Sequence, residues 1–253
     1  MKGVYLFTTK FHQMKQNPLF IIYQWFIAFP VLLILTILTA IATTILSPLL
    51  PNSQLSYFPA RWWGRAFCYL LFIKVRIKGL ELLHPNQSYI IACNHQSMYD
   101  IFVIYGWFPM FFKWIMKAEL RKIPLVGKAC EAAGHIFIDR SNPIAAKKSL
   151  ERAEAQLKNG VSVVIFPEGT RTRDGKPGKF KKGAFRIATD LNLPVVPVTI
   201  RGAFECLPRN KWNVHPGKIE VFIHEPIEVQ QFLPDHTQEI IEFTREKIVS
   251  KLI

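Results

Sequence analysis

An uncharged segment near the N-terminus constrains this chain more than any other feature. Residues 19–50 read LFIIYQWFIAFPVLLILTILTAIATTILSPLL and contain no charged side chain. As one helix the segment would be about 48 Å long, whereas the hydrocarbon core of a bilayer is about 30 Å thick. It is too long, and begins too late, to be a secretory signal peptide. We therefore predict membrane-anchoring helices over residues 1–56.

Two paths of this segment through a membrane remain open. Pro30 removes one helical hydrogen bond and clashes with the preceding turn, so it offers a break into two shorter helices. Basic residues lie on both sides of the segment: Lys2, Lys10, Lys15, Arg61, Arg65, Lys74, Arg76 and Lys78. Because positive flanks stay on the cytoplasmic side, they favour a hairpin that dips into one leaflet over a single kinked and tilted span.

Charge and composition limit the class of partner. The 32 basic and 18 acidic residues give a net charge of +14, which implies an anionic partner such as phospholipid headgroups, phosphorylated small molecules, coenzyme A or nucleic acid. We expect no nucleic acid, because no stretch resembles a nucleic-acid-binding motif and an uncharged membrane segment is foreign to that class. The four cysteines lack CxxC spacing and the seven histidines lack HxxxH or HExxH spacing, so we predict reduced cysteines and no metal site.

From about residue 73 the pattern changes to short β-rich runs that alternate with helical stretches. Strands are predicted over 73–79, 88–94, 135–139, 161–166, 195–200 and 219–224. Helices are predicted over 98–108, 125–133, 143–158, 181–191 and 237–252. This alternation predicts an α/β domain over 57–253, with a mixed, mostly parallel sheet flanked by helices.

Ligands of such folds bind beyond the carboxyl ends of the strands. The segment NHQSMYD, residues 94–100, follows one predicted strand, and FPEGTR, residues 166–171, ends another. His95 and Asp100 could not face each other on one helix, since five residues turn the helix by about 140°. They can meet if His95 precedes a helix and Asp100 lies in its first turn.

Two interpretations of NHQSMYD share that geometry. Ser97 and Asp100 resemble a capping box that starts the apolar helix IFVIY, with His95 as a loop residue. Alternatively, the Asp100 carboxylate fixes the tautomer of His95 and offsets the imidazolium formed when the ring accepts a proton. Since the chain has no GxSxG motif, the activated hydroxyl would belong to the substrate.

The loop after FPEGT is strongly basic. Between Arg171 and Arg186 it holds seven cations against the single acid Asp174. Such a loop suits a phosphate or pyrophosphate, and Gly169 allows close approach of the backbone. The alternative is a solvated basic loop or one that lies on anionic lipid.

Four ordered blocks together resemble the glycerolipid acyltransferase family over roughly residues 60–225. They are NHQSMYD (94–100), KAELRKIPLVGKA (117–129) leading to GHIFIDR (134–140), FPEGTR (166–171) and LPVVPVTIRGAF (193–204). The resemblance implies transfer of an acyl group, from acyl-CoA or acyl-carrier protein, to the sn-2 hydroxyl of 1-acyl-sn-glycerol 3-phosphate, which gives phosphatidic acid. It also implies the cytoplasmic face of the inner membrane as the location, membrane phospholipids as surroundings, and no cofactor besides the acyl donor.

The resemblance implies roles for the matching positions. His95 would be the general base and Asp100 would orient it. The residues that would bind the substrate phosphate are Lys117, Arg140, Glu168, Gly169, Thr170 and Arg171. The fourth block is equally an acyl-donor site or a core strand, and YGWFPMFFKW (105–114) is either part of a groove that measures acyl length or an aromatic core patch.

Other functions remain as alternatives. Another member of the same family would acylate a different lysolipid or glycerol 3-phosphate itself. A rival from a different class is a protein without catalytic activity that binds anionic membranes or nucleic acid through its positive surface.

Overall fold

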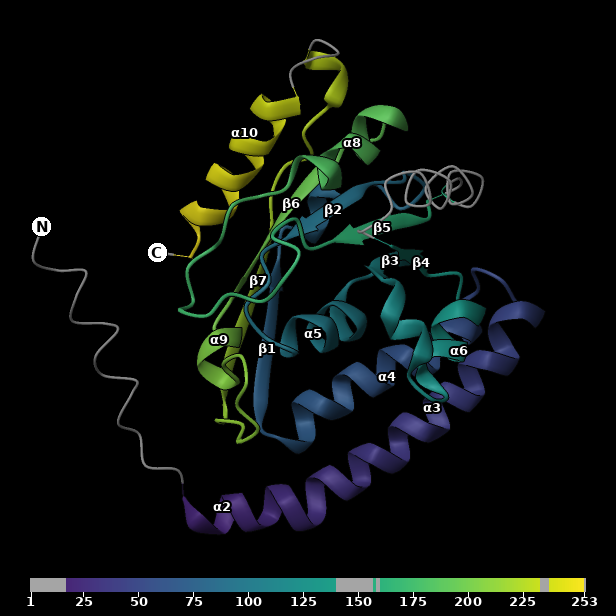
Figure 1. The fold of residues 1–253 in the computed structure, drawn as a ribbon, viewed down its shortest axis with the longest axis vertical. Coiled ribbons are helices and arrows are strands. Elements are labelled where there is room, and N and C mark those ends of the chain that lie inside the picture. Colours follow the sequence, from purple (N-terminus) through teal and green to yellow (C-terminus); the bar gives the residue numbers. More distant parts are fainter. Residues whose placement is uncertain (1–16, 140–156, 158–159, 233–236, 253) are drawn as a thin grey trace, which may run out of the picture.

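The computed structural model describes residues 17–139, 157, 160–232 and 237–252 (Figure 1). Its centre is a seven-stranded sheet in the order β1-β7-β6-β2-β5-β3-β4. The strands are β1 (Ile73–Lys78), β2 (Ile90–Cys93), β3 (Phe112–Lys117), β4 (Ile136–Ile138), β5 (Ser162–Ile165), β6 (Val195–Arg201) and β7 (Gly217–Ile223). All neighbouring strands are parallel except β6 and β7. This confirms the predicted mixed, mostly parallel α/β sheet.

Six strands lie where the sequence predicts them, and β3 was missed. Phe112 and Trp114 of β3 are buried, while Lys113 between them extends to donate to the Ala133 carbonyl oxygen at 2.7 Å. This alternation is typical of a strand. It is hard to see in the sequence because the residues directly before β3 are apolar almost throughout, so its start does not stand out.

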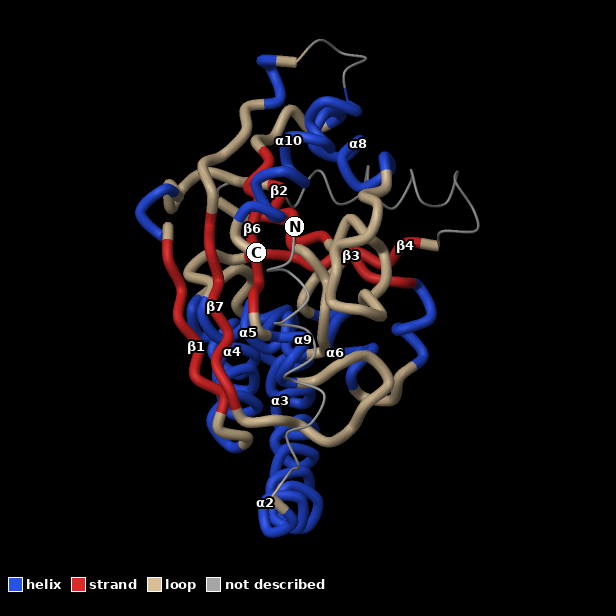
Figure 2. The backbone as a smooth tube through the Cα atoms, turned by 90° about the vertical axis from the view of Figure 1, so that its left-hand side faces the viewer, coloured by secondary structure: helices blue, strands red, loops and turns tan. Residues whose placement is uncertain are grey.

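The sheet is covered on both faces by helices. They are α4 (Gln54–Leu70), α5 (Tyr99–Trp107), α6 (Val126–Ala132), α8 (Lys182–Asp190), α9 (Ala203–Cys206) and α10 (Thr237–Ser250). Four of the five predicted helices are therefore present, and the fifth, over 143–158, lies outside the described residues except for Leu157. The figures place α8 and α10 at the end of the molecule far from the N-terminal helix (Figures 1 and 2).

Successive residues of β2 serve two separate cores. Ile91 and Cys93 pack with the buried residues of α5, whereas Ile90 and Ala92 pack with those of α8 and α10. The cause is the two-residue period of a strand, which sends neighbouring side chains to opposite faces. A strand buried on both faces reads as a continuous apolar run, as IIAC does.

The apolar N-terminal segment is one continuous helix, Pro18–Leu49, of 32 residues. It comprises α2 (Pro18–Tyr23), a π-helical turn (Gln24–Ala28) and α3 (Phe29–Leu49). It begins where the Asn17 side chain accepts the backbone N–H of Leu19 at 3.0 Å. By length and composition this helix is long enough and apolar enough to cross a membrane.

The break predicted at Pro30 is wrong, and with it a hairpin folded within residues 19–50. The wide π turn comes directly before Pro30, and its hydrogen bond runs from the Phe29 N–H to the Gln24 carbonyl oxygen. We infer that this wider turn gives the proline ring room, so the helix continues. The chain reverses only after Leu49.

Helix α4 runs back along the N-terminal helix. The Tyr23 hydroxyl donates to the Leu70 carbonyl oxygen at 3.0 Å, and the Trp63 indole donates to the Thr36 hydroxyl at 2.9 Å. One face of α4 is packed and the other leaves Trp62 exposed. Because α4 begins at Gln54, the predicted boundary at residue 56 falls inside it, and the division into anchor and enzyme domains stays a prediction.

The close approach of α4 to α5 depends on Gly64, and replacing it should destabilise the fold. A Cβ added at Gly64 would collide with the Phe102 carbonyl oxygen and lie 3.0 Å from the Gly106 nitrogen. We expect Gly64→Ala to cost about 1–3 kcal/mol, as overpacking does, and to lower Tm by several degrees in scanning fluorimetry. Gly183→Ala in α8 is the matched control, because nothing lies within 4 Å of its added Cβ. Equal Tm values for the two variants would contradict close α4–α5 packing.

Candidate active site

The motif segments lie together at one edge of the sheet. β2 is parallel to both β5 and β6, and β5 is parallel to β3, so the carboxyl ends of these strands point the same way. NHQSMYD follows β2 and FPEGTR follows β5. The two segments are therefore neighbours at the position where open α/β sheets bind ligands.

Asn94 sets the point at which the chain leaves β2. Its side chain donates to the Ile200 carbonyl oxygen at 2.8 Å and accepts the Ile200 N–H at 2.7 Å. The amide thus extends the pairing of β2 with β6 by side-chain hydrogen bonds, and it is fully buried. The next residue, His95, starts from a fixed backbone position.

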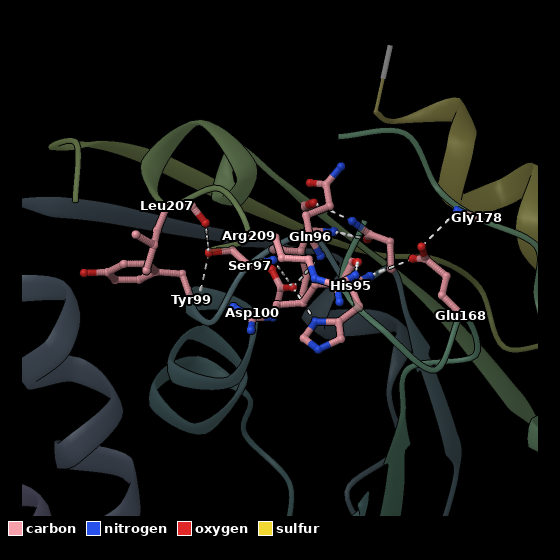
Figure 3. A network of polar contacts seen from close by, with 12 residues as sticks. His95, Gln96, Ser97, Tyr99, Asp100, Glu168, Gly178, Leu207 and Arg209 are labelled. Carbon is pink, nitrogen blue, oxygen red and sulfur yellow. Dashed lines mark hydrogen bonds and ion pairs between the residues drawn. The ribbon is translucent and has the colours of Figure 1, made fainter. Parts of the chain in front are cut away.

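The structure brings His95 and Asp100 together. His95 Nδ1 lies 2.8 Å from Asp100 Oδ2, and the same oxygen accepts the backbone N–H groups of Gln96 at 2.7 Å and Ser97 at 2.8 Å (Figure 3). Asp100 is in the first turn of α5 and fully buried. As the sequence required for such a contact, His95 precedes the helix and Asp100 lies in its first turn.

The start of helix α5 and the His95–Asp100 pair use the same carboxylate. Asp100 reaches back to the Ser97 N–H, as the acid of a capping box does. Ser97 does not complete the box, because its hydroxyl accepts the Tyr99 N–H at 3.2 Å and donates to the Leu207 carbonyl oxygen at 2.8 Å. The two interpretations of NHQSMYD are thus compatible.

The hydrogen bonds fix the tautomer of His95. Because Asp100 Oδ2 accepts from two backbone N–H groups, it is an acceptor, and Nδ1 of His95 carries the proton that it donates to this oxygen. The lone pair then lies on Nε2, and no described residue bonds this atom. The ring stacks on Phe166 at 3.8 Å between centroids and an angle of 9°, with 14% of the side chain exposed. The ring is therefore held in place with a basic nitrogen left available.

Glu168 joins the two segments. Its Oε1 accepts the His95 N–H at 2.8 Å, and its Oε2 accepts the Gly178 N–H at 2.9 Å. Burial raises the pKa of Glu168, while these two hydrogen bonds act in the opposite direction. Since both oxygens accept from the backbone, the carboxylate braces the loop; direct binding of the substrate by Glu168 stays a prediction.

Further contacts close the basic loop around the histidine segment. The Thr172 N–H donates to the His95 carbonyl oxygen at 2.9 Å, and the Gln96 side chain donates to the Gly175 carbonyl oxygen at 2.6 Å. Gly169 has a φ of 75°, a conformation that suits glycine, so the tight turn after β5 depends on it. The loop is therefore a built part of the site and not a free solvated segment.

An open pocket of about 570 Å³ adjoins the segment that carries His95, because two of its lining residues, Glu168 and Thr172, are hydrogen-bonded to the His95 backbone. Its lining consists of Glu168, Thr170, Arg171, Thr172, Arg173, Asp174, Lys176, Pro177, Gly178, Lys179 and Arg209. Burial lowers the pKa of Arg171, the nearby charge of Arg209 lowers it further, and Asp100 opposes both. This is a strongly positive pocket suited to an anion.

Two further residues were predicted to bind the substrate phosphate, Lys117 and Arg140. Lys117 is exposed at the carboxyl end of β3, at the same edge of the sheet but outside the pocket lining. Arg140 lies outside the described residues. Within the described residues, no group of three metal-ligating side chains is close enough to hold a metal ion.

The sequence did not point to Arg209 or to the ring under His95. Arg209 comes from the segment between α9 and β7, which carries no recognisable motif. Phe166 belongs to FPEGTR, but only the fold brings it under the imidazole, with Trp114 stacked at 5.4 Å on Phe166 in turn. The rings of Phe108, Phe112 and Trp114 are buried, which agrees with the interpretation of 105–114 as an aromatic core patch.

Comparison with known proteins agrees with this arrangement. The family model described as Acyltransferase matches residues 74–201. A chloroplastic 1-acyl-sn-glycerol-3-phosphate acyltransferase of Arabidopsis thaliana is 36% identical over 173 residues, which are 68% of this chain and 48% of that relative. The enzyme of the same name from Pseudomonas aeruginosa is 34% identical over 183 residues, which are 70% of each chain. This chain thus spans about half the length of the Arabidopsis relative and more of the bacterial one.

A solved structure is similar over nearly its whole length. The crystal structure of the 1-acyl-sn-glycerophosphate acyltransferase PlsC from Thermotoga maritima matches with a TM-score of 0.70 and 31% sequence identity, covering 91% of this chain and 95% of the other. The matched residues 74–201 contain the His95–Asp100 pair, Glu168 and Arg171. The chain therefore belongs to the acyltransferase family.

Proposed function

We propose that this protein transfers an acyl group to the sn-2 hydroxyl of 1-acyl-sn-glycerol 3-phosphate and so makes phosphatidic acid. The observation that carries the proposal is the His95–Asp100 pair at 2.8 Å beside a pocket lined by cations. A base next to an anion site suits a substrate that has both a hydroxyl and a phosphate. The names of the relatives agree with this substrate.

In this mechanism the substrate itself supplies the nucleophile. His95 Nε2 takes the proton of the hydroxyl as its oxygen attacks the carbonyl carbon of an acyl thioester. Asp100 stabilises the imidazolium that results, because its buried carboxylate stays charged and accepts a hydrogen bond from the Nδ1–H group. When the tetrahedral intermediate collapses, the carbon–sulfur bond breaks and the thiolate receives the proton from Nε2. No covalent acyl-enzyme and no cofactor are needed.

The proposal also includes the acyl donor and the location of the enzyme. The donor is acyl-CoA or acyl-carrier protein, either of which supplies the thioester. The proposed location is the cytoplasmic face of the inner membrane, and the long apolar surface that the helix Pro18–Leu49 exposes supports a membrane anchor. A lysolipid could then reach the pocket with its acyl chain still in the bilayer. Another lysolipid or glycerol 3-phosphate is the alternative acceptor.

Purified protein offered a labelled acyl donor and a panel of acceptors tests the proposal. His95→Ala should lower kcat on lysophosphatidic acid by about 10²–10⁴-fold, because the general base is lost. Binding to anionic vesicles, measured by cosedimentation, should stay unchanged. No acyl transfer by the unaltered protein to any acceptor, with vesicle binding intact, would favour the non-catalytic membrane-binding alternative. Full activity of His95→Ala would remove His95 as the base, and a faster rate on a phosphate-free acceptor would overturn the proposed substrate.

Arg171→Ala should mainly weaken binding of the phosphorylated acceptor. A charge-assisted hydrogen bond contributes about 1.5–3 kcal/mol, so we expect KM for lysophosphatidic acid to rise about tenfold to hundredfold while kcat changes little. Arg186→Ala is the control, since Arg186 is exposed on α8 and outside the pocket lining. An unchanged KM in Arg171→Ala would remove the phosphate role.

Glu168→Gln should show whether Glu168 supports the backbone of the site or binds the acceptor directly. A glutamine presents one oxygen and one NH2 group to two backbone N–H donors, so one of the two hydrogen bonds is lost. We expect kcat to fall more than KM rises, because the His95 backbone loses its support. Steady-state kinetics over a range of acceptor concentrations measure both values. A rise in KM alone would show that Glu168 acts in acceptor binding instead.

A further inference from the structure

The segment 207–214, which we call the strap, connects three parts of the molecule. At its start the Leu207 carbonyl oxygen accepts the Ser97 hydroxyl at 2.8 Å. At its end the Gln24 side chain donates to the Trp212 carbonyl oxygen at 3.0 Å and accepts the Val214 N–H at 2.8 Å. The strap therefore runs from the segment that carries the catalytic pair to the N-terminal helix.

Gln24 is unusual in its helix. It is fully buried, and it lies in the π turn of an otherwise apolar segment. Burying an amide without hydrogen bonds is costly, and here the strap backbone satisfies both its donor and its acceptor. The neighbouring Trp25 indole adds a contact to the Asn213 side chain at 3.1 Å. The π turn thus fixes the strap through specific polar contacts.

Between these two ends, the strap carries Arg209 into the pocket. Arg209 Nη1 donates to the Arg171 carbonyl oxygen at 3.0 Å, and Figure 3 draws Arg209 in the same polar network as His95 and Ser97. Both arginines line the pocket. Among the described residues, neither forms an ion pair with a carboxylate.

Two guanidinium groups that line the same pocket repel each other, and an anion bound between them offsets that repulsion. Guanidinium groups bind phosphate oxygens through paired, geometrically defined hydrogen bonds. A phosphate monoester has enough charge and enough oxygens to accept from both. The pair is therefore suited to a phosphorylated ligand and is costly without one.

We propose that Arg209 binds the acceptor phosphate together with Arg171, and that Gln24 positions Arg209 by holding the strap. This inference rests on the proposed function, because it assigns a second residue to the same acceptor. It also makes acceptor affinity depend on a polar contact between the N-terminal helix and the strap. Arg209 is thus a binding residue, and Gln24 acts only through it.

The first test measures binding without turnover. In the His95→Ala protein, a short-chain soluble lysophosphatidic acid is titrated by calorimetry into three further variants. Arg209→Gln should raise Kd about tenfold to hundredfold, and Arg209→Lys should raise it less because the charge remains. Lys211→Gln is the matched control, a cation of the strap that is exposed and outside the pocket lining, and should leave Kd unchanged. An unchanged Kd in Arg209→Gln would overturn the role of Arg209.

The second test asks whether Gln24 acts through Arg209. Gln24→Leu should raise Kd, while Thr44→Val should not, because the Thr44 hydroxyl bonds only to the Ala40 carbonyl oxygen of its own helix. In a double-mutant cycle, Gln24→Leu should add little to Arg209→Gln, since the residue being positioned is already gone. Fully additive effects, with folding intact by Tm, would show that Gln24 acts by another route.

These tests can fail separately from the proposed function. Acyl transfer by the unaltered protein on the acceptor panel reports the reaction. The ratio of Kd values between Arg209→Gln and its parent reports the inference. If the protein acylates lysophosphatidic acid but binds it equally well without Arg209, the proposed function stands and the role of Arg209 in phosphate binding is overturned.

Discussion

One carboxylate oxygen holds the centre of this structure together. Asp100 Oδ2 accepts hydrogen bonds from the backbone N–H groups of Gln96 and Ser97 and from Nδ1 of His95. The distances between donor and acceptor atoms are 2.7, 2.8 and 2.8 Å. A buried carboxylate must be paired or hydrogen-bonded, and here a turn of backbone and an imidazole share that task. The helix start and the orientation of the base therefore cannot be separated. Any change that frees the histidine also removes a partner from the first turn of α5.

The backbone of the basic loop is held by hydrogen bonds, one of which goes to the Glu168 carboxylate. Seven cations on a free loop would repel each other and spread into solvent, but Glu168, Gln96 and the His95 carbonyl oxygen hold the loop backbone in place. The cations that line the pocket are thereby kept close to the segment that carries His95. Electrostatic attraction for an anion follows from this backbone arrangement, because charges act strongly only at short range under physiological salt.

The sequence predicted what depends on short separations. The His95–Asp100 contact spans five residues, and the strand and helix periods are local, so both could be inferred without a structure. Contacts between distant segments could not. Asn94 meets Ile200, 106 residues away, and Gln24 meets Trp212, 188 residues away. Nor could the sequence show that a π turn would let the helix pass Pro30, or that Glu168 would use both oxygens on backbone groups.

The reversal of direction between β6 and β7 has a consequence for the whole edge of the sheet. β6 and β7 are antiparallel, and Arg201 at the end of β6 pairs with Glu220 in the middle of β7, so the chain returns into the sheet from the end at which it left. If the strand after β6 were parallel to it, the chain would first need a crossover connection to the other end of the strands. Because of the reversal, residues 202–216 never leave the side on which β2 and β5 end. A fold assembled mainly from parallel units thus has its binding edge completed by the later half of its own chain.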